Sequence, residues 1–164
     1  MASETLGEEE QAMTTRSIVH GSFTVKRTYP HAPARVFRHW SDPTLKRSWY
    51  GGPGQGDRRP VFEFRVGGLE NNFGTVGEQR FAVEHVYYDI VPDNRIVYAY
   101  DVKINDVVTS LSIAAVEFRP SGMGTELIVT EHGAFLDGHD YADERQGGTN
   151  WVLDRLGEVL NEQA

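Results

Sequence analysis

The chain has 164 residues, a formal net charge of −8 and no cysteine. A chain of this length fits one domain and can bury about 70% of its unfolded surface, so a hydrophobic core can form without cross-links. The lack of cysteine excludes disulfides and thiolate metal sites. The acidic charge argues against binding to nucleic acid and to anionic membranes.

No apolar run approaches the roughly 18 residues of a membrane-spanning helix. The acidic N-terminal residues lack the basic and apolar regions of a secretory signal. We therefore expect a cytoplasmic protein in which residues 1–16 form a disordered tail and residues 17–164 form a single domain.

The first part of that domain predicts a strand followed by two short helices. Residues 18–29 alternate apolar and polar side chains, as a strand does. Pro33 and Pro43 are placed to begin helices, where the missing N–H of proline costs nothing, and Asp42 can cap the second helix.

A glycine-rich stretch from Gly51 to Gly56 comes next. A phosphate-binding loop follows a strand and begins a helix. This stretch follows a helix and leads into a strand, which favours a flexible connector or a lid.

The middle of the chain predicts six further strands, at 60–66, 69–76, 79–91, 95–103, 107–119 and 124–132. The segments between them carry turn residues: Gly67-Gly68, Pro92-Asp93-Asn94, Asn105-Asp106 and Ser121-Gly122-Met123-Gly124. Connections this short make a sheet antiparallel.

Residues 140–164 predict one long helix, because five apolar side chains recur at helical spacing: Val152, Leu153, Leu156, Val159 and Leu160. A single amphipathic helix after many antiparallel strands must bury its apolar stripe on their sheet. The prediction is an α+β helix-grip fold, in which a curved, seven-stranded antiparallel sheet wraps around the C-terminal helix and two short helices lie between strands one and two. A cavity is expected where the sheet curves away from the helix.

Several local motifs occur in an order that resembles a known family. They are Ala34-Arg35-Val36-Phe37, Phe64-Arg65-Val66-Gly67-Gly68, Asp89-Ile90-Val91-Pro92, Gly124-Thr125-Glu126-Leu127 and Phe135-Leu136-Asp137-Gly138. The chain resembles the AHSA-like group, named for an activator of a heat-shock chaperone ATPase, within the START/Bet v (SRPBCC) superfamily of helix-grip proteins. The resemblance implies the helix-grip fold. It also implies functions that range from lipid carriage to polyketide cyclisation, and a chaperone as one potential partner.

Glu131 is the one candidate for acid–base chemistry. Alternation puts it on the same strand face as Leu127 and Val129. If that face lies toward the helix, Glu131 enters the cavity, where desolvation would raise its pKa. The alternative is a carboxylate at the sheet edge, paired with Arg145 or another cation.

The histidines and serines predict no catalytic or metal site. His132, Asp137, His139 and Asp140 are close in sequence, but their spacing matches no established metal site, so solvated loop residues are expected. His85 lies mid-strand, where a hydrogen-bonded structural histidine is the default. Ser110 and Ser112 could bind a ligand, but an exposed sheet face is favoured.

Aromatic residues dominate the predicted ligand-binding set, since tyrosine in a cavity offers an apolar body and a polar tip. That set is Trp49, Phe64, Phe73, Tyr87, Tyr98, Tyr100, Leu111, Val129, Glu131 and Trp151.

The leading hypothesis is a non-enzymatic protein, monomeric or homodimeric and without a cofactor, that binds a small hydrophobic or aromatic ligand between sheet and helix. One alternative is a cyclase-like or hydrolase-like enzyme that uses Glu131 with a tyrosine. Another is a module that interacts with a chaperone.

Overall fold

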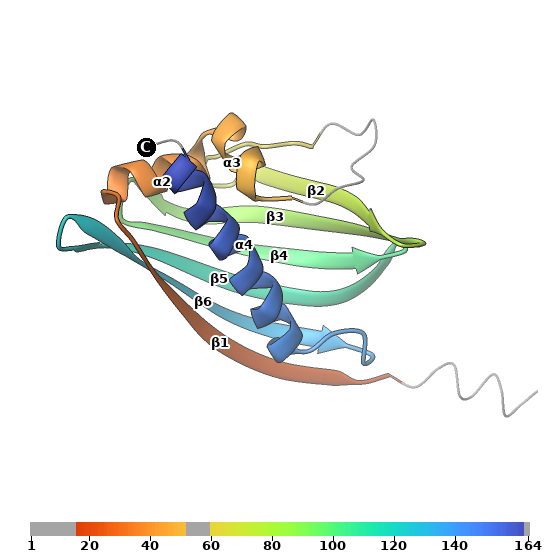
Figure 1. Ribbon diagram of the computed structural model, residues 1–164. Coiled ribbons are helices and arrows are strands. Elements are labelled where there is room, and N and C mark those ends of the chain that lie inside the picture. Colours follow the sequence, from red (N-terminus) through yellow and green to blue (C-terminus); the bar gives the residue numbers. More distant parts are fainter. Residues whose placement is uncertain (1–15, 52–59, 163–164) are drawn as a thin grey trace, which may run out of the picture.

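The computed structural model describes residues 16–51 and 60–162. These residues form six strands and three helices in the order β1 (Ile18–Tyr29), α2 (Pro33–Ser41), α3 (Pro43–Trp49), β2 (Leu69–Val76), β3 (Gln79–Val91), β4 (Arg95–Ile104), β5 (Val107–Ser121), β6 (Gly124–Leu136) and α4 (Ala142–Glu162). The strands form one antiparallel sheet in the order β1-β6-β5-β4-β3-β2. The sheet curves around α4, and α2 and α3 lie at one end of the same face (Figure 1).

The two short helices begin as the sequence predicts. Pro33 and Pro43 each occupy the first turn of a helix, and the Asp42 carboxylate accepts hydrogen bonds from the backbone N–H groups of Thr44 and Leu45. Turn residues with positive φ connect the later strands: Asp93, Asn105, Asp106 and Gly122. These turns are confirmed.

The predicted strand at 60–66 is wrong, and the described sheet has six strands rather than seven. In the described part of this segment, the strand-like pairing is limited to one isolated bridge between Phe62 and Glu70. Two side chains replace the backbone acceptors of a regular ladder: the Val61 N–H donates to the Asn71 side chain at 2.6 Å, and the Leu69 N–H donates to the Glu63 carboxylate at 3.3 Å. Side-chain acceptors of this kind compete with strand pairing.

Helix α4 buries its apolar stripe on the sheet, as predicted. Leu153, Leu156, Val159 and Leu160 are buried in a core shared with α2, α3 and the concave face of the sheet. Burial of one such side chain contributes about 1.5–3 kcal/mol, so this stripe accounts for the docking of the helix.

Polar contacts fix the position of α4 along β1. The Tyr29 hydroxyl donates to the Leu153 carbonyl at 2.7 Å, and Arg27 forms an ion pair with Asp154 at 3.0 Å. At the other end of β1, a Cβ on Gly21 would lie 2.5 Å from the Cβ of Ala142. The glycine therefore lets the start of α4 approach the strand.

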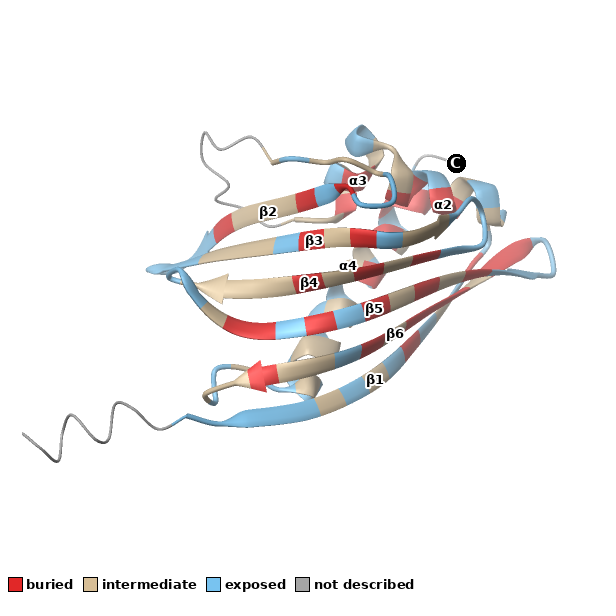
Figure 2. Ribbon diagram, turned by 180° about the vertical axis from the view of Figure 1, so that it is seen from behind, coloured by how far each residue is buried: buried red, intermediate tan, exposed pale blue. Residues whose placement is uncertain are grey.

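The opposite face of the sheet carries no helix among the described residues, and exposed and buried positions alternate along its strands (Figure 2). Along β5, Leu111 and Ile113 are exposed, whereas Ser110, Ser112 and Ala114 are buried. The strands therefore present one face to the core and the other to solvent.

Two predictions fall wholly or partly outside the described residues. The tail at 1–15 and the glycine-rich positions from Gly52 to Gly56 are not described. Arg16, which the prediction put in the tail, is described and pairs with Asp137 at 3.1 Å.

Candidate functional site

Small side chains in the middle of the sheet create a hollow beneath α4. Ala114 separates Tyr98 from Glu131 in one row across three strands, and Ser112 separates Tyr100 from Gly133 in the next row. The larger side chains of Tyr98 and Glu131 flank Ala114, and that of Tyr100 flanks Ser112. The result is a cavity of about 350 Å³ between the sheet, the C-terminal end of α3 and the N-terminal half of α4, at the small end of the roughly 300–1,000 Å³ typical of ligand pockets.

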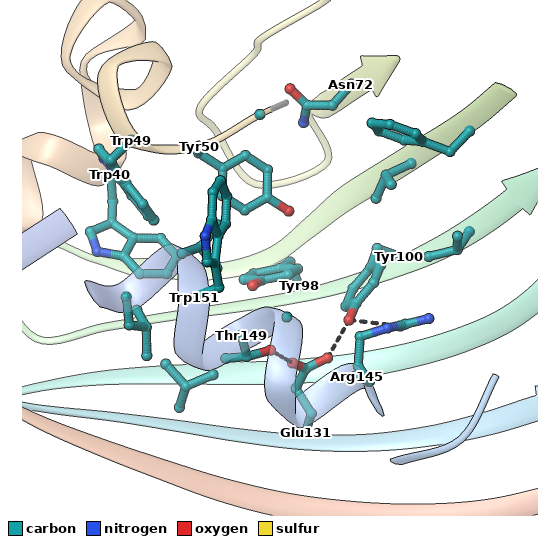
Figure 3. A pocket seen from close by; sticks show the side chains of 18 residues that line it. Trp40, Trp49, Tyr50, Asn72, Tyr98, Tyr100, Glu131, Arg145, Thr149 and Trp151 are labelled. Carbon is teal, nitrogen blue, oxygen red and sulfur yellow. Dashed lines mark hydrogen bonds between the residues drawn. The ribbon is translucent and has the colours of Figure 1, made fainter. Parts of the chain in front are cut away.

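One end of the cavity is aromatic. Trp40, Trp49 and Tyr50 come from α2 and from the end of α3, Tyr98 comes from β4, and Trp151 comes from α4 (Figure 3). Trp40 and Trp49 pack edge to face with ring centroids 4.8 Å apart. Trp151 is 55% exposed and so marks where the cavity meets the surface.

The other end is polar and centres on Glu131, which is 4% exposed. Its carboxylate accepts hydrogen bonds from the Tyr100 hydroxyl and, at 3.1 Å, from the Thr149 hydroxyl (Figure 3). Burial raises the pKa of Glu131, although the two hydroxyls and nearby Arg145 act in the opposite direction. This arrangement lies between the two predicted alternatives: the carboxylate lines the cavity, but β6 is an interior strand and no direct ion pair with Arg145 forms among the described residues.

Arg145 connects α4 to this polar end. Its guanidinium donates to the Tyr100 hydroxyl at 2.9 Å and to the Ser110 hydroxyl at 2.7 Å, and pairs with Asp140 at 2.6 Å. Burial by itself would lower the pKa of Arg145, but Tyr100 and Asp140 raise it, so the side chain is a fixed cation. The expectation that Ser110 and Ser112 lie on an exposed face is wrong, because both are buried beside this guanidinium.

A second buried polar group lies behind the aromatic end. The Lys46 ammonium pairs with Glu70 at 3.4 Å, and the Tyr87 hydroxyl donates to the same carboxylate. Burial lowers the pKa of Lys46. Burial alone would raise the pKa of Glu70, but the adjacent Lys46 and the hydrogen bonds hold it below its usual value.

His85 forms hydrogen bonds both to Glu70 of this buried group and to Tyr50 in the cavity wall. It is the hydrogen-bonded structural histidine that the sequence predicts. Its Nδ1–H donates to the Glu70 carbonyl at 3.3 Å, so Nε2 is the acceptor for the Tyr50 hydroxyl at 3.1 Å. Burial lowers the pKa of His85 to about 4, and the ring is therefore neutral near pH 7.

The structure brings six of the ten predicted ligand-binding residues together around the cavity: Trp49, Tyr98, Tyr100, Val129, Glu131 and Trp151. The other four lie elsewhere. Phe64 and Tyr87 pack on each other at 5.1 Å within the core. Phe73 pairs with Ala82 on the outer face of the sheet, and Leu111 is 54% exposed on that face.

A β-bulge explains the position of Leu111. Lys103 pairs with Val108 but Val102 pairs with Ser110, so Thr109 is an extra residue in β5. In a ladder without the bulge, Thr109 would pair with Val102 and Leu111 with Tyr100, so Leu111 would face the cavity. One added residue reverses the direction of every side chain after it.

Several lining residues were absent from the predicted set. Phe81, Val83 and Val102 share strand faces with predicted members, so alternation could have identified them. Val152 belongs to the predicted apolar stripe of α4, and Thr149 lies one helical turn before it toward the N-terminus. Arg145 and Tyr50 carried no such periodic signal, because they depend on contacts between distant segments.

The histidines near α4 do not gather. His132 lies within β6 and is exposed, and Asp140 pairs with Arg145. Among residues 16–51 and 60–162, no three potential metal-ligating side chains form a cluster.

In the same residues, no helix has the length and apolar character needed to cross a membrane.

Comparison with known proteins identifies the family of this chain. The family described as "Activator of Hsp90 ATPase homolog 1-like protein" matches residues 30–161. The chain belongs to this family. No protein with a curated description matches the chain.

Solved structures agree with this AHSA1-like assignment. The chain is 40% identical to protein Mll3558 from Rhizobium loti, with a TM-score of 0.81 over 87% of this chain and 99% of that one. It is 35% identical to a protein from Rhizobium leguminosarum, with a TM-score of 0.84 over 91% and 99%. CalU16 from Micromonospora echinospora is 17% identical, with a TM-score of 0.62 over 90% and 87%, and shares the fold.

Proposed function

We propose that this AHSA1-like protein binds a small, mainly apolar aromatic molecule in the cavity between the sheet and α4. The observation that supports this proposal is the lining: a cavity of about 350 Å³ has indole and phenol rings at one end and a few buried polar groups at the other. Small-molecule sites in proteins have this composition, with apolar walls for affinity and few polar groups for orientation.

The cavity volume of about 350 Å³ is large enough for a molecule of two fused rings. Naphthalene is therefore a suitable probe. At a concentration 100 times its dissociation constant, a ligand stabilises the native state by about 2.7 kcal/mol. For a domain of this size, that raises Tm by roughly 5–10 °C.

The test is a titration with naphthalene, followed by thermal unfolding and by amide NMR. We expect a saturable rise in Tm and shifts confined to residues that line the cavity. Val152→Phe adds a ring to a lining position and should abolish the response. Val76→Phe adds the same ring at an exposed position and is the matched control. An absent response in the wild type, or an unchanged response in Val152→Phe, would refute the proposal.

A second candidate function rests on the surroundings of Glu131. A buried carboxyl with a raised pKa, hydrogen-bonded to the Tyr100 hydroxyl, lies beside space that a substrate could occupy. Glu131 could remove the proton next to the carbonyl of a cyclic ketone while a hydroxyl stabilises the enolate oxygen, as in the enolisation step of a cyclase.

Exchange of the acidic protons of 2-tetralone for deuterium measures this proton transfer. The wild type should accelerate the exchange and Glu131→Gln should not, while Glu126→Gln on the other face of β6 serves as the control. Equal acceleration by the wild type and by Glu131→Gln would remove Glu131 from the role of base.

A further inference from the structure

The concave side of the protein carries five tyrosines, and four of them have hydrogen-bond acceptors from the chain itself. Tyr29 donates to a backbone carbonyl, Tyr50 to His85, Tyr87 to Glu70 and Tyr100 to Glu131. Tyr98 differs from them: it is nine-tenths buried and lines the cavity, and its hydroxyl has no hydrogen-bond partner among the described residues. Since buried polar groups are nearly always paired, this exception needs an explanation.

The Tyr98 hydroxyl reaches the cavity and is not enclosed by protein atoms. The fully enclosed side-chain atoms without a partner in the described residues are Trp40 Nε1 and Asp101 Oδ1, and the Tyr98 oxygen is not one of them. The ring itself is held in place, with centroid distances of 5.2 Å to His85 and 5.9 Å to Tyr100. Figure 3 shows Tyr98 among the groups that line the cavity. A fixed ring therefore presents a free donor and acceptor to whatever occupies the site.

The charged groups of the lining have partners already. Arg145 pairs with Asp140 at 2.6 Å, and Glu131 accepts hydrogen bonds from two hydroxyls. Burial also raises the pKa of Glu131, which favours its uncharged form. A charged ligand would lose its hydration without gaining an unpaired counter-ion from the described residues, and that loss is expensive in a buried site.

We propose that the Tyr98 hydroxyl recognises an uncharged oxygen, such as a hydroxyl or a ketone, on an aromatic ligand. This inference rests on the proposed function and adds a chemical class to it: the site prefers neutral oxygenated aromatic molecules to the parent hydrocarbon and to aromatic carboxylates. A hydrogen-bonding group in an apolar site discriminates well, because a ligand without the matching atom leaves that group unpaired.

Calorimetric titration with naphthalene, 2-naphthol and 2-naphthoate at pH 7 tests the proposal. The wild type is compared with Tyr98→Phe and with Tyr88→Phe, which removes a hydroxyl from an exposed tyrosine. We expect the affinity ratio of 2-naphthol to naphthalene to fall roughly fivefold to tenfold in Tyr98→Phe, as for the loss of one hydrogen bond. The affinity for naphthalene should not fall, because the variant no longer leaves an unpaired hydroxyl beside the hydrocarbon, and Tyr88→Phe should match the wild type.

The comparison of ratios cancels the difference in hydration between the two ligands. An equal ratio in the wild type and in Tyr98→Phe would overturn the role of Tyr98, whereas naphthalene binding in both would uphold the proposed function. If none of the three ligands binds to the wild type, both proposals fail. Should Tyr98→Phe not fold, the wild type still decides: 2-naphthoate that binds as tightly as 2-naphthol would refute the preference for neutral ligands.

Discussion

His85 makes the stability of the fold depend on pH. The folded state keeps its ring neutral down to a pKa of about 4, whereas the unfolded chain takes up a proton below about 6.5. The unfolded state therefore binds more protons between these values. The stabilising effect of the neutral ring is fully present above pH 6.5 and is lost as the pH falls toward 4.

The size of this effect follows from the two pKa values. At pH 7.5 both states are almost wholly neutral at this residue, and at pH 5 only the unfolded state is charged. The linkage relation gives a loss of about 2 kcal/mol in the free energy of unfolding between these pH values. The ring is 3% exposed, so solvent screening reduces this figure little.

Urea unfolding at pH 7.5 and pH 5, followed by tryptophan fluorescence, measures the loss. The raised pKa of Glu131 acts in the opposite sense, since its folded form holds a proton more tightly. For this reason the informative quantity is the difference in pH dependence between the wild type and His85→Gln, a variant that keeps a donor and an acceptor but does not titrate. We expect that difference to be about 2 kcal/mol.

The control is His132→Gln, which removes an exposed histidine from β6. An NMR titration of the His85 ring gives its folded pKa directly. If His85→Gln shows the same pH dependence as the wild type, or if the ring titrates near 6.5, then the reasoning from burial is wrong.

Three further variants test the packing. Lys46→Met should lower the free energy of unfolding by about 3 kcal/mol, because the buried Glu70 carboxylate loses its cation; addition of Glu70→Gln should restore part of the loss in urea unfolding. Gly147→Ala should raise stability by about 0.5–1 kcal/mol, since a Cβ there meets open space in a helix, and an unchanged Tm would contradict this. Gly21→Val should displace the start of α4 through a clash with Ala142, seen as faster amide exchange in that turn.

Part of the candidate site could be predicted from alternation along strands. Alternation predicts that Leu127, Val129 and Glu131 share a face, and they do; the prediction left the direction of that face open, and the structure turns it toward α4, with Glu131 in the cavity. This inference succeeded because β6 pairs with β1 and β5 without interruption, so its side-chain period stays at two.

Other parts could not be predicted, because they depend on partners that are distant in sequence. The bulge at Thr109 reverses the faces of β5, so Leu111 lies outside and Ser110 inside. A rule that places apolar side chains in the core fails there, since Arg145 from α4 satisfies the serine hydroxyl. The strand predicted at 60–66 failed for a more local reason, because the Asn71 and Glu63 side chains accept hydrogen bonds that a regular ladder would give to backbone carbonyls.

Apart from the strand at 60–66, the sequence by itself determined the type and order of the elements, since helical and strand periods and turn residues act over a few neighbouring positions. Only the tertiary structure decided which polar groups are paired and which face a cavity. The unpaired hydroxyl of Tyr98 is a property of that arrangement: among the residues that the structure describes, the other four tyrosines of the concave side find acceptors on other segments, and Tyr98 does not. Hydrogen bonds between distant segments depend on geometry that no local pattern encodes.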